Sequence, residues 1–157
     1  SNTMEFSFCS VSLHRVLNEI GSAQRINMRE GVELLLDLPG QEVTVYTDSA
    51  RLSQVINNLV NNAIKFTSEG NIRIGYRPAA SGYVNIFVED NGKSMSREVL
   101  EHIFDRFYKG DSFKQGTGLG LSICKTIVKR FEGKIEVTST PGKGTCFTIT
   151  LPLKVEE

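Results

Sequence analysis

Three separate stretches of this chain combine groups that are suited to holding phosphates and a metal ion. Residues 57–66, Asn-Asn-Leu-Val-Asn-Asn-Ala-Ile-Lys-Phe, place carboxamides and a lysine on a predicted helix. Residues 116–121, Gly-Thr-Gly-Leu-Gly-Leu, open another predicted helix, where backbone N–H groups and the helix dipole favour an anion. Between them, Asp90 follows an apolar strand and precedes Asn91-Gly92. Carboxamides for Mg²⁺, a carboxylate for a base and glycines for phosphates together indicate an ATP site.

The carboxamide helix carries Asn58, Asn62 and Lys65 on one side. At about 100° per residue, these three positions fall within about 60° of one another and border the apolar face. Asparagine is a poor helix former, so four asparagines within six residues suggest a compensating role. Carboxamide oxygens are hard ligands suited to Mg²⁺. A solvated polar face is the alternative, and the helix alone does not decide between the two.

Asp90 is a candidate for base recognition. A carboxylate at the end of a strand could accept a hydrogen bond from the exocyclic amine of adenine, a donor that guanine lacks at the same position. An aspartate before Asn-Gly is also common turn chemistry, so a purely structural role is the alternative.

The glycine run has Gly116, Gly118 and Gly120 in alternation. It lacks the spacing of a dinucleotide-binding loop and the Gly-Lys-Ser/Thr ending of a P-loop. Its position at a helix start favours phosphate binding, and a flexible hinge is the alternative. Lys109 and Lys114 on the preceding loop could close over a triphosphate.

Hydrophobic periodicity and turn residues predict the elements that position these groups. We expect helices from a cap at Ser10 or Ser12 to near Gly31, from Asp48 or Ser49 to Phe66, over residues 97–104, and from the glycine run to Gly133. Strands are expected at residues 32–38, 43–47, 71–77, 83–89, 134–139 and 145–151. Pro39-Gly40 should join the first two strands, and the remaining four should form two hairpins. This order predicts an α/β two-layer sandwich, with about three long helices on one face of a mixed, mostly antiparallel sheet.

Composition excludes several classes of function. The 157 residues fit a single domain over 1–157, and 18 basic residues balance 18 acidic ones. A neutral protein has no broad basic face for nucleic acid or an anionic membrane. Three cysteines without paired spacing fit a reducing cytosol and argue against structural zinc. Apolar runs are too short to span a bilayer, and residues 1–5, with Ser1-Asn2-Thr3 before Met4, read as a cloning remnant or linker.

In this order and spacing, the segments resemble the ATP-binding catalytic domain of bacterial sensor histidine kinases. That superfamily also holds type II topoisomerase, mismatch-repair and heat-shock-chaperone ATPases. Residues 48–67 match the kinase N box, 90–95 (Asp-Asn-Gly-Lys-Ser-Met) resemble the G1 box, 103–108 the F box and 116–121 the G2 box. The likeness extends from about Phe6 to Leu153.

The resemblance assigns a role to each matching residue. It implies that Asn62 coordinates Mg²⁺, that Asn58 lies beside the phosphates and that Lys65 contacts them. It implies that Asp90 holds the adenine amine and that Gly92 lets the backbone approach the ring.

The remaining implied roles concern the lid over the ATP. Phe104 and Phe107 would anchor its base, and Lys109 stands where many family members place a phosphate-contacting arginine. The triphosphate would be wrapped by the glycine run, namely Gly116, Thr117, Gly118, Leu119 and Gly120.

Three departures from the family pattern affect the expected function. Ser94 occupies the second glycine of the usual Asp-x-Gly-x-Gly, where a positive φ would strain serine by about 1–2 kcal/mol or its side chain would push the loop away from the base. We therefore expect weaker nucleotide binding than in a typical relative. The lid, residues 110–115, is short. His14 and His102 lack the histidine–acid pair of a phosphoacceptor helix.

The resemblance implies an enzyme module that gives the γ-phosphoryl of Mg·ATP to a histidine on a separate dimerisation domain of the same full-length protein. The implied downstream partner is a response regulator receiver domain, with no nucleic acid involved. The fragment would be a monomer, the full protein a homodimer, and this part the cytoplasmic portion of a membrane-anchored sensor. A conformational ATPase is disfavoured, because Asn58 stands where such proteins have a glutamate and cannot act as a base. A non-catalytic pseudokinase is the third reading, and Ser94 keeps it open.

Overall fold

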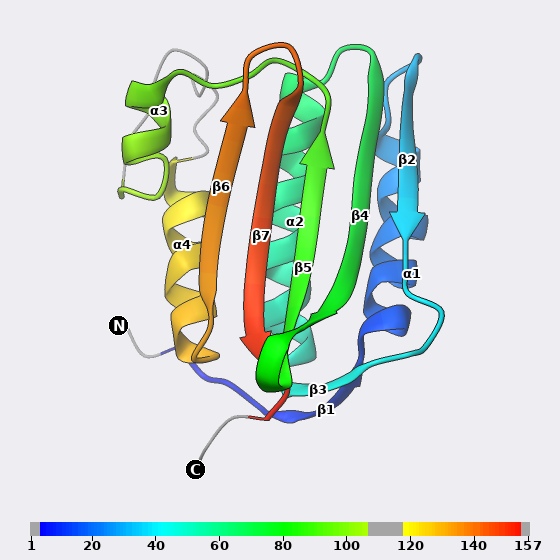
Figure 1. Ribbon diagram of the computed structural model, residues 1–157, viewed down its shortest axis with the longest axis vertical. Helices are drawn as coiled ribbons and strands as arrows, with labels where there is room; N and C mark the ends of the chain where they lie inside the picture. The colour runs from blue at the N-terminus through cyan, green and yellow to red at the C-terminus, as the bar shows by residue number, and fades with distance from the viewer. Residues whose placement is uncertain (1–3, 107–117, 155–157) are drawn as a thin grey trace.

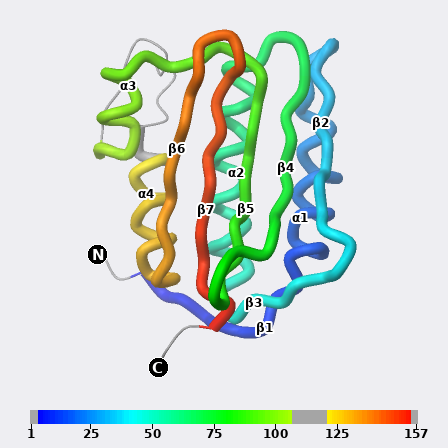
Figure 2. The backbone as a smooth tube through the Cα atoms, viewed as in Figure 1, coloured from blue at the N-terminus to red at the C-terminus, as the bar shows by residue number. Residues whose placement is uncertain are grey.

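Within residues 4–106 and 118–154, which the computed structural model describes, three long helices cover one face of a five-stranded sheet (Figures 1 and 2). The strand order is β2-β4-β5-β7-β6, in which β2 pairs with β4 in parallel and all other neighbours are antiparallel. The strands are β2 (Val32–Asp37), β4 (Gly70–Ala79), β5 (Tyr83–Asp90), β6 (Lys134–Thr140) and β7 (Gly144–Pro152). The predicted mixed, mostly antiparallel sheet is confirmed.

The long helices are α1 (Leu13–Gln24), α2 (Ser49–Phe66) and α4 (Gly118–Arg130), and the short α3 (Arg97–His102) lies near β6. Three of these four helices begin after a capping side chain, and the caps at Ser12 and Asp48 were expected. The side chains of Ser12, Asp48 and Ser96 accept hydrogen bonds from backbone N–H groups three residues later, at 3.2, 2.9 and 3.2 Å. Each cap satisfies a donor that a helix start leaves without an intrahelical partner.

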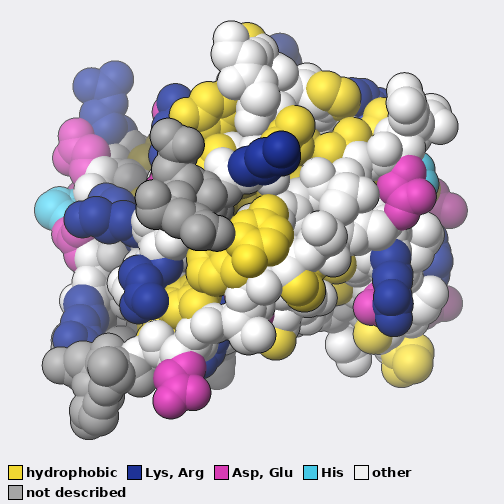
Figure 3. All heavy atoms as spheres, turned by 90° about the horizontal axis from the view of Figure 1, so that it is seen from below, with side chains coloured by type: hydrophobic (Ala, Val, Ile, Leu, Met, Phe, Trp, Pro, Cys, Tyr) yellow, Lys and Arg dark blue, Asp and Glu magenta, His cyan; other side chains and the backbone are white. Residues whose placement is uncertain are grey.

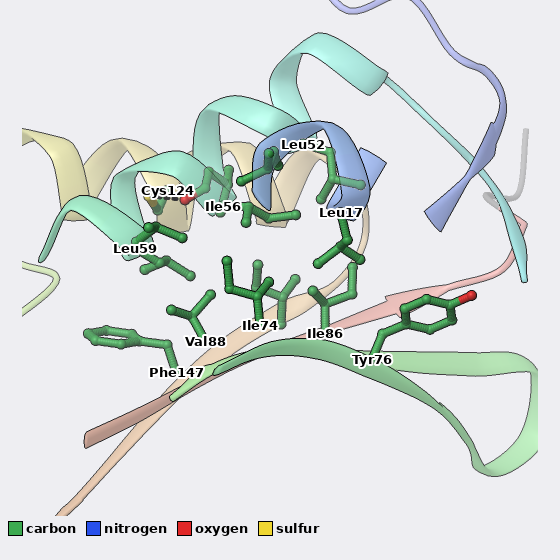
Figure 4. Packing of buried hydrophobic residues seen from close by; sticks show 14 of the residues in the cluster. Leu17, Leu52, Ile56, Leu59, Ile74, Tyr76, Ile86, Val88, Cys124 and Phe147 are labelled. Atoms are coloured by element: carbon green, nitrogen blue, oxygen red, sulfur yellow. Dashed lines mark hydrogen bonds between the residues drawn. The ribbon is translucent and has the colours of Figure 1, made fainter. Parts of the chain in front are cut away.

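The core lies between α2 and the inner face of the sheet (Figure 4). Leu52, Ile56 and Leu59 of α2 point toward Ile74 of β4 and Ile86 of β5, and all five are fully buried. Alternate residues of β5 are buried, as expected for a strand with one covered face. Because the apolar stripe fixes the rotation of α2, the polar residues that border it also have a fixed direction.

The structure differs from the predicted elements at the N-terminal end. Strand β1 (Cys9–Ser12) was not expected; it pairs antiparallel with β3 (Thr44–Thr47) in a separate two-stranded sheet. The strand expected at 32–38 and the strand expected at 43–47 therefore belong to different sheets, although only residues 38–43 separate β2 from β3. Helix α1 ends at Gln24 and continues only as a 3₁₀ turn, η1 (Arg25–Asn27), in which Ile26 has 86% of its surface exposed.

The N-terminal segment, from Met4 to β1, crosses the end of the molecule at which β3 lies (Figure 1). Phe6 and Phe8 pack edge-on against Phe131, with ring centroids 5.7 and 5.9 Å apart. Arg130 stacks over Phe6 at 4.4 Å. From this end, the surface shows hydrophobic side chains at its centre, with basic and acidic side chains around them (Figure 3). No helix in the described part of the chain is long and apolar enough to cross a membrane.

Candidate functional site

Several predicted site residues meet around the C-terminal half of α2. The segment that follows β5, residues 91–96, crosses the end of this helix, and the Lys93 N–H donates to the Phe66 carbonyl at 3.0 Å. Helix α4 packs along α2, so that the Asn58 carboxamide reaches the Cys124 thiol. The carboxamide helix thus contacts both the segment that follows the acidic strand end and the helix that follows the glycine run, as expected for an ATP site.

Asn62 has a buried carboxamide with an unsatisfied oxygen. Only 3% of the residue is exposed, and its Nδ2 donates to the backbone carbonyl of Asn58 at 3.2 Å. Its Oδ1 has no hydrogen-bond partner among the described residues. A buried acceptor left in this way costs about 1–3 kcal/mol, so the site favours a cation or an ordered donor at this oxygen.

Asn58 lies one turn earlier and is half-buried. Its Nδ2 lies 3.7 Å from Cys124 Sγ in α4. Burial raises the pKa of the Cys124 thiol to about 11, so the group stays protonated at neutral pH. A protonated, buried thiol is chemically inert and acts here as a weak hydrogen-bonding group.

The other two asparagines of α2 face a different helix. Gln24 of α1, only 6% exposed, donates from Nε2 to Asn57 Oδ1 at 2.8 Å and to Asn61 Oδ1 at 3.2 Å. Its own Oε1 accepts from Asn27 at 3.0 Å. The asparagine-rich stretch therefore divides into two pairs: one joins α2 to α1, and the other borders α4 and the candidate site.

Asp90 ends β5 with a buried carboxyl group, 5% exposed. Burial raises its pKa to about 6, although the backbone N–H groups of Gly92 and Thr145 and the Thr67 hydroxyl act against this rise. The Gly92 N–H donates to Asp90 Oδ1 at 2.9 Å. At neutral pH the group is thus a partly desolvated anion, well suited to accept from an amine.

Packing within the protein explains why position 92 is a glycine. A Cβ at this position would lie 2.2 Å from the Phe66 carbonyl oxygen and 2.8 Å from Thr67 Cα. Glycine is therefore required for the segment to pack on the end of α2, whether or not a base also approaches it. Sequence reasoning missed the corresponding role of Gly144, which has φ +112° and whose Cβ would lie 2.0 Å from the Asp90 carbonyl oxygen. Its only signal was the Pro-Gly-Lys-Gly turn that contains it.

The expected backbone strain at Ser94 is wrong. Among the described residues other than glycine, positive φ occurs at Ser81 and Glu132 and not at Ser94. The half-buried serine therefore needs no left-handed conformation. The segment is held in place one residue later, where the Met95 N–H donates to Ser139 Oγ at 2.8 Å.

Two further candidates, Phe104 and Lys65, differ in their surroundings. The ring of Phe104 packs edge-on against that of Phe147, with centroids 6.2 Å apart, and the Lys125 ammonium lies 5.9 Å from the Phe104 ring centroid. Lys65 is exposed in the last turn of α2. Helix α4 begins at Gly118 and includes Leu119 and Gly120. Phe107, Lys109, Gly116 and Thr117 lie outside the described residues.

The side chains of the candidate site favour a cation that takes few ligands from the protein. Among the described residues, no group of three or more His, Cys, Asp or Glu side chains could hold a metal ion. Mg²⁺ needs few protein ligands when it also binds phosphates, so the unsatisfied Asn62 oxygen fits such an ion. A separate groove of about 750 Å³ on the helix-free face of the sheet, lined by residues such as Asn85, Thr148 and Thr150, does not include any of these groups.

Comparison with known proteins gives a match over most of the chain. Residues 47–155 match the family described as histidine kinase-, DNA gyrase B- and HSP90-like ATPases. The adaptive-response sensory kinase SasA of Crocosphaera subtropica is 40% identical over 127 residues, which cover 79% of this chain and 33% of that protein. The aerobic respiration control sensor protein ArcB of Escherichia coli is 37% identical over 134 residues, covering 82% and 17%. The chain thus spans about a third or less of the length of these relatives.

Solved structures show the same fold. The catalytic domain of the histidine kinase ThkA, in a nucleotide-free form, has a TM-score of 0.85 and 29% identity, covering 95% of this chain and 97% of that one. Full-length ShkA in complex with AMPPNP has a TM-score of 0.88 and 25% identity, covering 99% of this chain and 33% of that one. The expected fold and the expected resemblance are both confirmed.

Proposed function

The chain belongs to the family of histidine kinase-, DNA gyrase B- and HSP90-like ATPases, and from this premise we propose that it binds Mg·ATP and transfers the γ-phosphoryl group to a histidine on a separate dimerisation domain of a sensor kinase. The observation that carries the proposal is the pair of buried acceptors near the end of α2. One is the unsatisfied Asn62 oxygen, and the other is the Asp90 carboxylate. The first suits a hard cation and the second suits an amine, which are the two ends of Mg·ATP.

Asp90 would select adenine. Its carboxylate accepts the Gly92 N–H and retains further lone pairs for the exocyclic amine. Guanine carries a carbonyl oxygen at the corresponding position, and this oxygen would face the carboxylate as a second acceptor. Asp90→Ala should therefore weaken ATP binding more than tenfold, which is about 1.4 kcal/mol or more.

Asn62 would hold the cation, which on binding neutralises phosphate charge and orients the group to be transferred. Lys65, exposed one turn after Asn62, can contact the phosphates from the end of α2. Asn58 cannot act as a general base, so positioning and charge neutralisation would supply most of the catalysis. The same lack argues against rapid ATP hydrolysis by this domain alone.

The partners follow from the same proposal. The phosphoacceptor histidine would belong to a dimerisation domain of the full-length protein, and a receiver domain would take the phosphoryl group from it. SasA, ArcB and the Vibrio harveyi autoinducer 2 sensor kinase/phosphatase LuxQ are sensor kinases much longer than this chain. One basis for an inert module, backbone strain at Ser94, is absent from the structure.

The decisive experiment compares two neighbouring asparagines. Asn62→Ala should abolish the Mg²⁺ dependence of ATP binding and of transfer to an added phosphoacceptor domain. Asn61→Ala is the matched control, because it removes the same side chain one residue away, where the amide bonds Gln24 instead. Isothermal titration calorimetry with ATP and GTP, each with and without Mg²⁺, and a radiolabelled transfer assay provide the readouts. Equal affinity for ATP and GTP, or full-rate transfer by Asn62→Ala, would overturn the proposal.

A further inference from the structure

Cys124 is a buried thiol at the contact between α4 and α2, and no role in the proposed chemistry has been given to it. It is fully buried and lies on the inner stripe of α4 with Leu121, Ile127 and Val128. Its environment is not purely apolar, because two polar groups of α2 lie within hydrogen-bonding distance of the sulfur. Figure 4 shows Cys124 beside α2, with one of these hydrogen bonds drawn.

The two contacts use the thiol in opposite senses. The sulfur accepts from Asn58 Nδ2 at 3.7 Å, and the S–H donates to the Val55 carbonyl oxygen at 3.8 Å. The Val55 carbonyl lies one turn before Asn58 on α2, so a single side chain of α4 contacts two successive turns of the carboxamide helix. An alanine or valine at position 124 would make neither contact.

The contact with Cys124 gives the Asn58 carboxamide a direction. A carboxamide has donors at one end and an acceptor at the other. Since the nitrogen end is directed at the sulfur, the oxygen end is turned away from Cys124. The backbone carbonyl of Asn58 meanwhile accepts from Asn62 Nδ2, which fixes the nitrogen end of that amide as well and leaves the Asn62 oxygen as an acceptor with no partner in the described part of the chain.

We propose that Cys124 is a positioning residue: its thiol holds the nitrogen end of Asn58, so that this carboxamide presents oxygen, not N–H, to the cation that accompanies the nucleotide. The inference rests on the proposed binding of Mg·ATP. A reversed amide would direct two N–H donors toward a cation, which is electrostatically unfavourable. Groups that orient a metal ligand affect metal affinity although they do not touch the metal.

The test compares Cys124→Ala with Cys124→Ser. Both variants remove the sulfur and leave a smaller side chain, but serine retains a group that can accept from Asn58 and donate to Val55. Val128→Ala, on the same buried stripe, is the control for lost packing. Calorimetry would measure the Mg²⁺ concentration that gives half of the maximal increase in ATP affinity. The side-chain NH₂ resonances of Asn58, assigned by NMR without nucleotide, provide a second readout.

We expect Cys124→Ala to raise the half-saturating Mg²⁺ concentration about threefold to tenfold, with Cys124→Ser within about twofold of the wild type. ATP affinity without Mg²⁺ should change little, and the Asn58 NH₂ resonances should move in Cys124→Ala and much less in Val128→Ala. An unchanged Mg²⁺ midpoint in Cys124→Ala, or an equal shift in Val128→Ala, would show that the thiol only fills space. If the wild type shows no Mg·ATP binding, the proposed function fails by itself. Unchanged Asn58 resonances in Cys124→Ala would then also overturn the positioning role, and moved resonances would support it.

Discussion

Replacing Asp90 by asparagine should stabilise the ligand-free protein at neutral pH while it impairs nucleotide binding. The carboxyl group is buried, and its pKa in the native state is about 6, against 3.8 for the unperturbed group. Asparagine has nearly the same shape and keeps an oxygen that can accept the Gly92 N–H, which donates at 2.9 Å. The substitution therefore removes the charge and preserves the hydrogen bond from the Gly92 N–H.

The size of the effect follows from linkage between protonation and folding. Between pH 3.8 and about 6, the native state binds more protons at Asp90 than the unfolded state, so the free energy of unfolding falls as the pH rises. Above about pH 6, the full cost of the buried charge is present. A difference of roughly two pKa units, at about 1.4 kcal/mol each, corresponds to about 3 kcal/mol. The advantage of Asp90→Asn over the wild type should grow by roughly 1–1.5 kcal/mol between pH 5 and pH 8.

Urea denaturation of both proteins at half-unit intervals from pH 5 to pH 8 would measure this advantage. Asp90→Ala is the companion variant, because it removes both the charge and the acceptor for Gly92 and should gain less stability than Asp90→Asn. ATP binding, measured by calorimetry at pH 7.5, should weaken in both variants. A wild type that is as stable as Asp90→Asn at pH 8, or a stability difference that does not change with pH, would refute the reasoning.

Other predictions concern packing and hydrogen bonds around the site. Gly92→Ala should destabilise the protein by about 1–3 kcal/mol in thermal denaturation, because its Cβ would collide with backbone, whereas Gly40→Ala, with nothing within 4 Å of the added Cβ, should not. Ser94→Gly should lower stability by about 0.4–1 kcal/mol, since the site has no strain to relieve; a gain in stability would contradict this. Gln24→Leu should cost about 0.5–1.5 kcal/mol, because the half-buried Asn57 and the exposed Asn61 lose their donor, with ATP affinity unchanged in calorimetry.

The regular elements were predictable because each has a local signal. Helix α2 has an apolar stripe and an aspartate cap, and strand β5 alternates buried and exposed residues. Strands β1 and β3 are different, since each has four residues and pairs only with the other, over more than thirty residues of intervening chain. Residues 43–47 gave a local signal for a strand but none for its partner. That partner is chosen by tertiary packing, which no short window of sequence contains.

The residue types of the candidate site could be predicted from the sequence, but the contacts that each asparagine makes could not. Spacing placed Asn58 and Asn62 together, and the structure confirms that both border the buried face of α2. Spacing could not reveal that Asn57 and Asn61 accept hydrogen bonds from Gln24, because these bonds depend on how α1 packs on α2. The alternative of a positive φ at Ser94 failed for a related reason: glycine in a family pattern indicates positive φ or close approach, and only a structure distinguishes them at each position.

The two asparagine pairs of α2 should have different roles, one in the stability of the fold and the other in ligand binding. Gln24 holds the pair that faces α1, and Cys124 contacts the pair that faces α4. A loss at Gln24 removes the donor to the Asn57 and Asn61 oxygens on the side of α2 that faces α1, so its cost should appear in the free energy of unfolding. A loss at Cys124 removes one contact that orients the Asn58 carboxamide, so its cost should appear in the Mg²⁺ dependence of ATP binding. Because both pairs share the same two turns of α2, any variant that changed both measurements equally would indicate movement of the whole helix and not of one side chain.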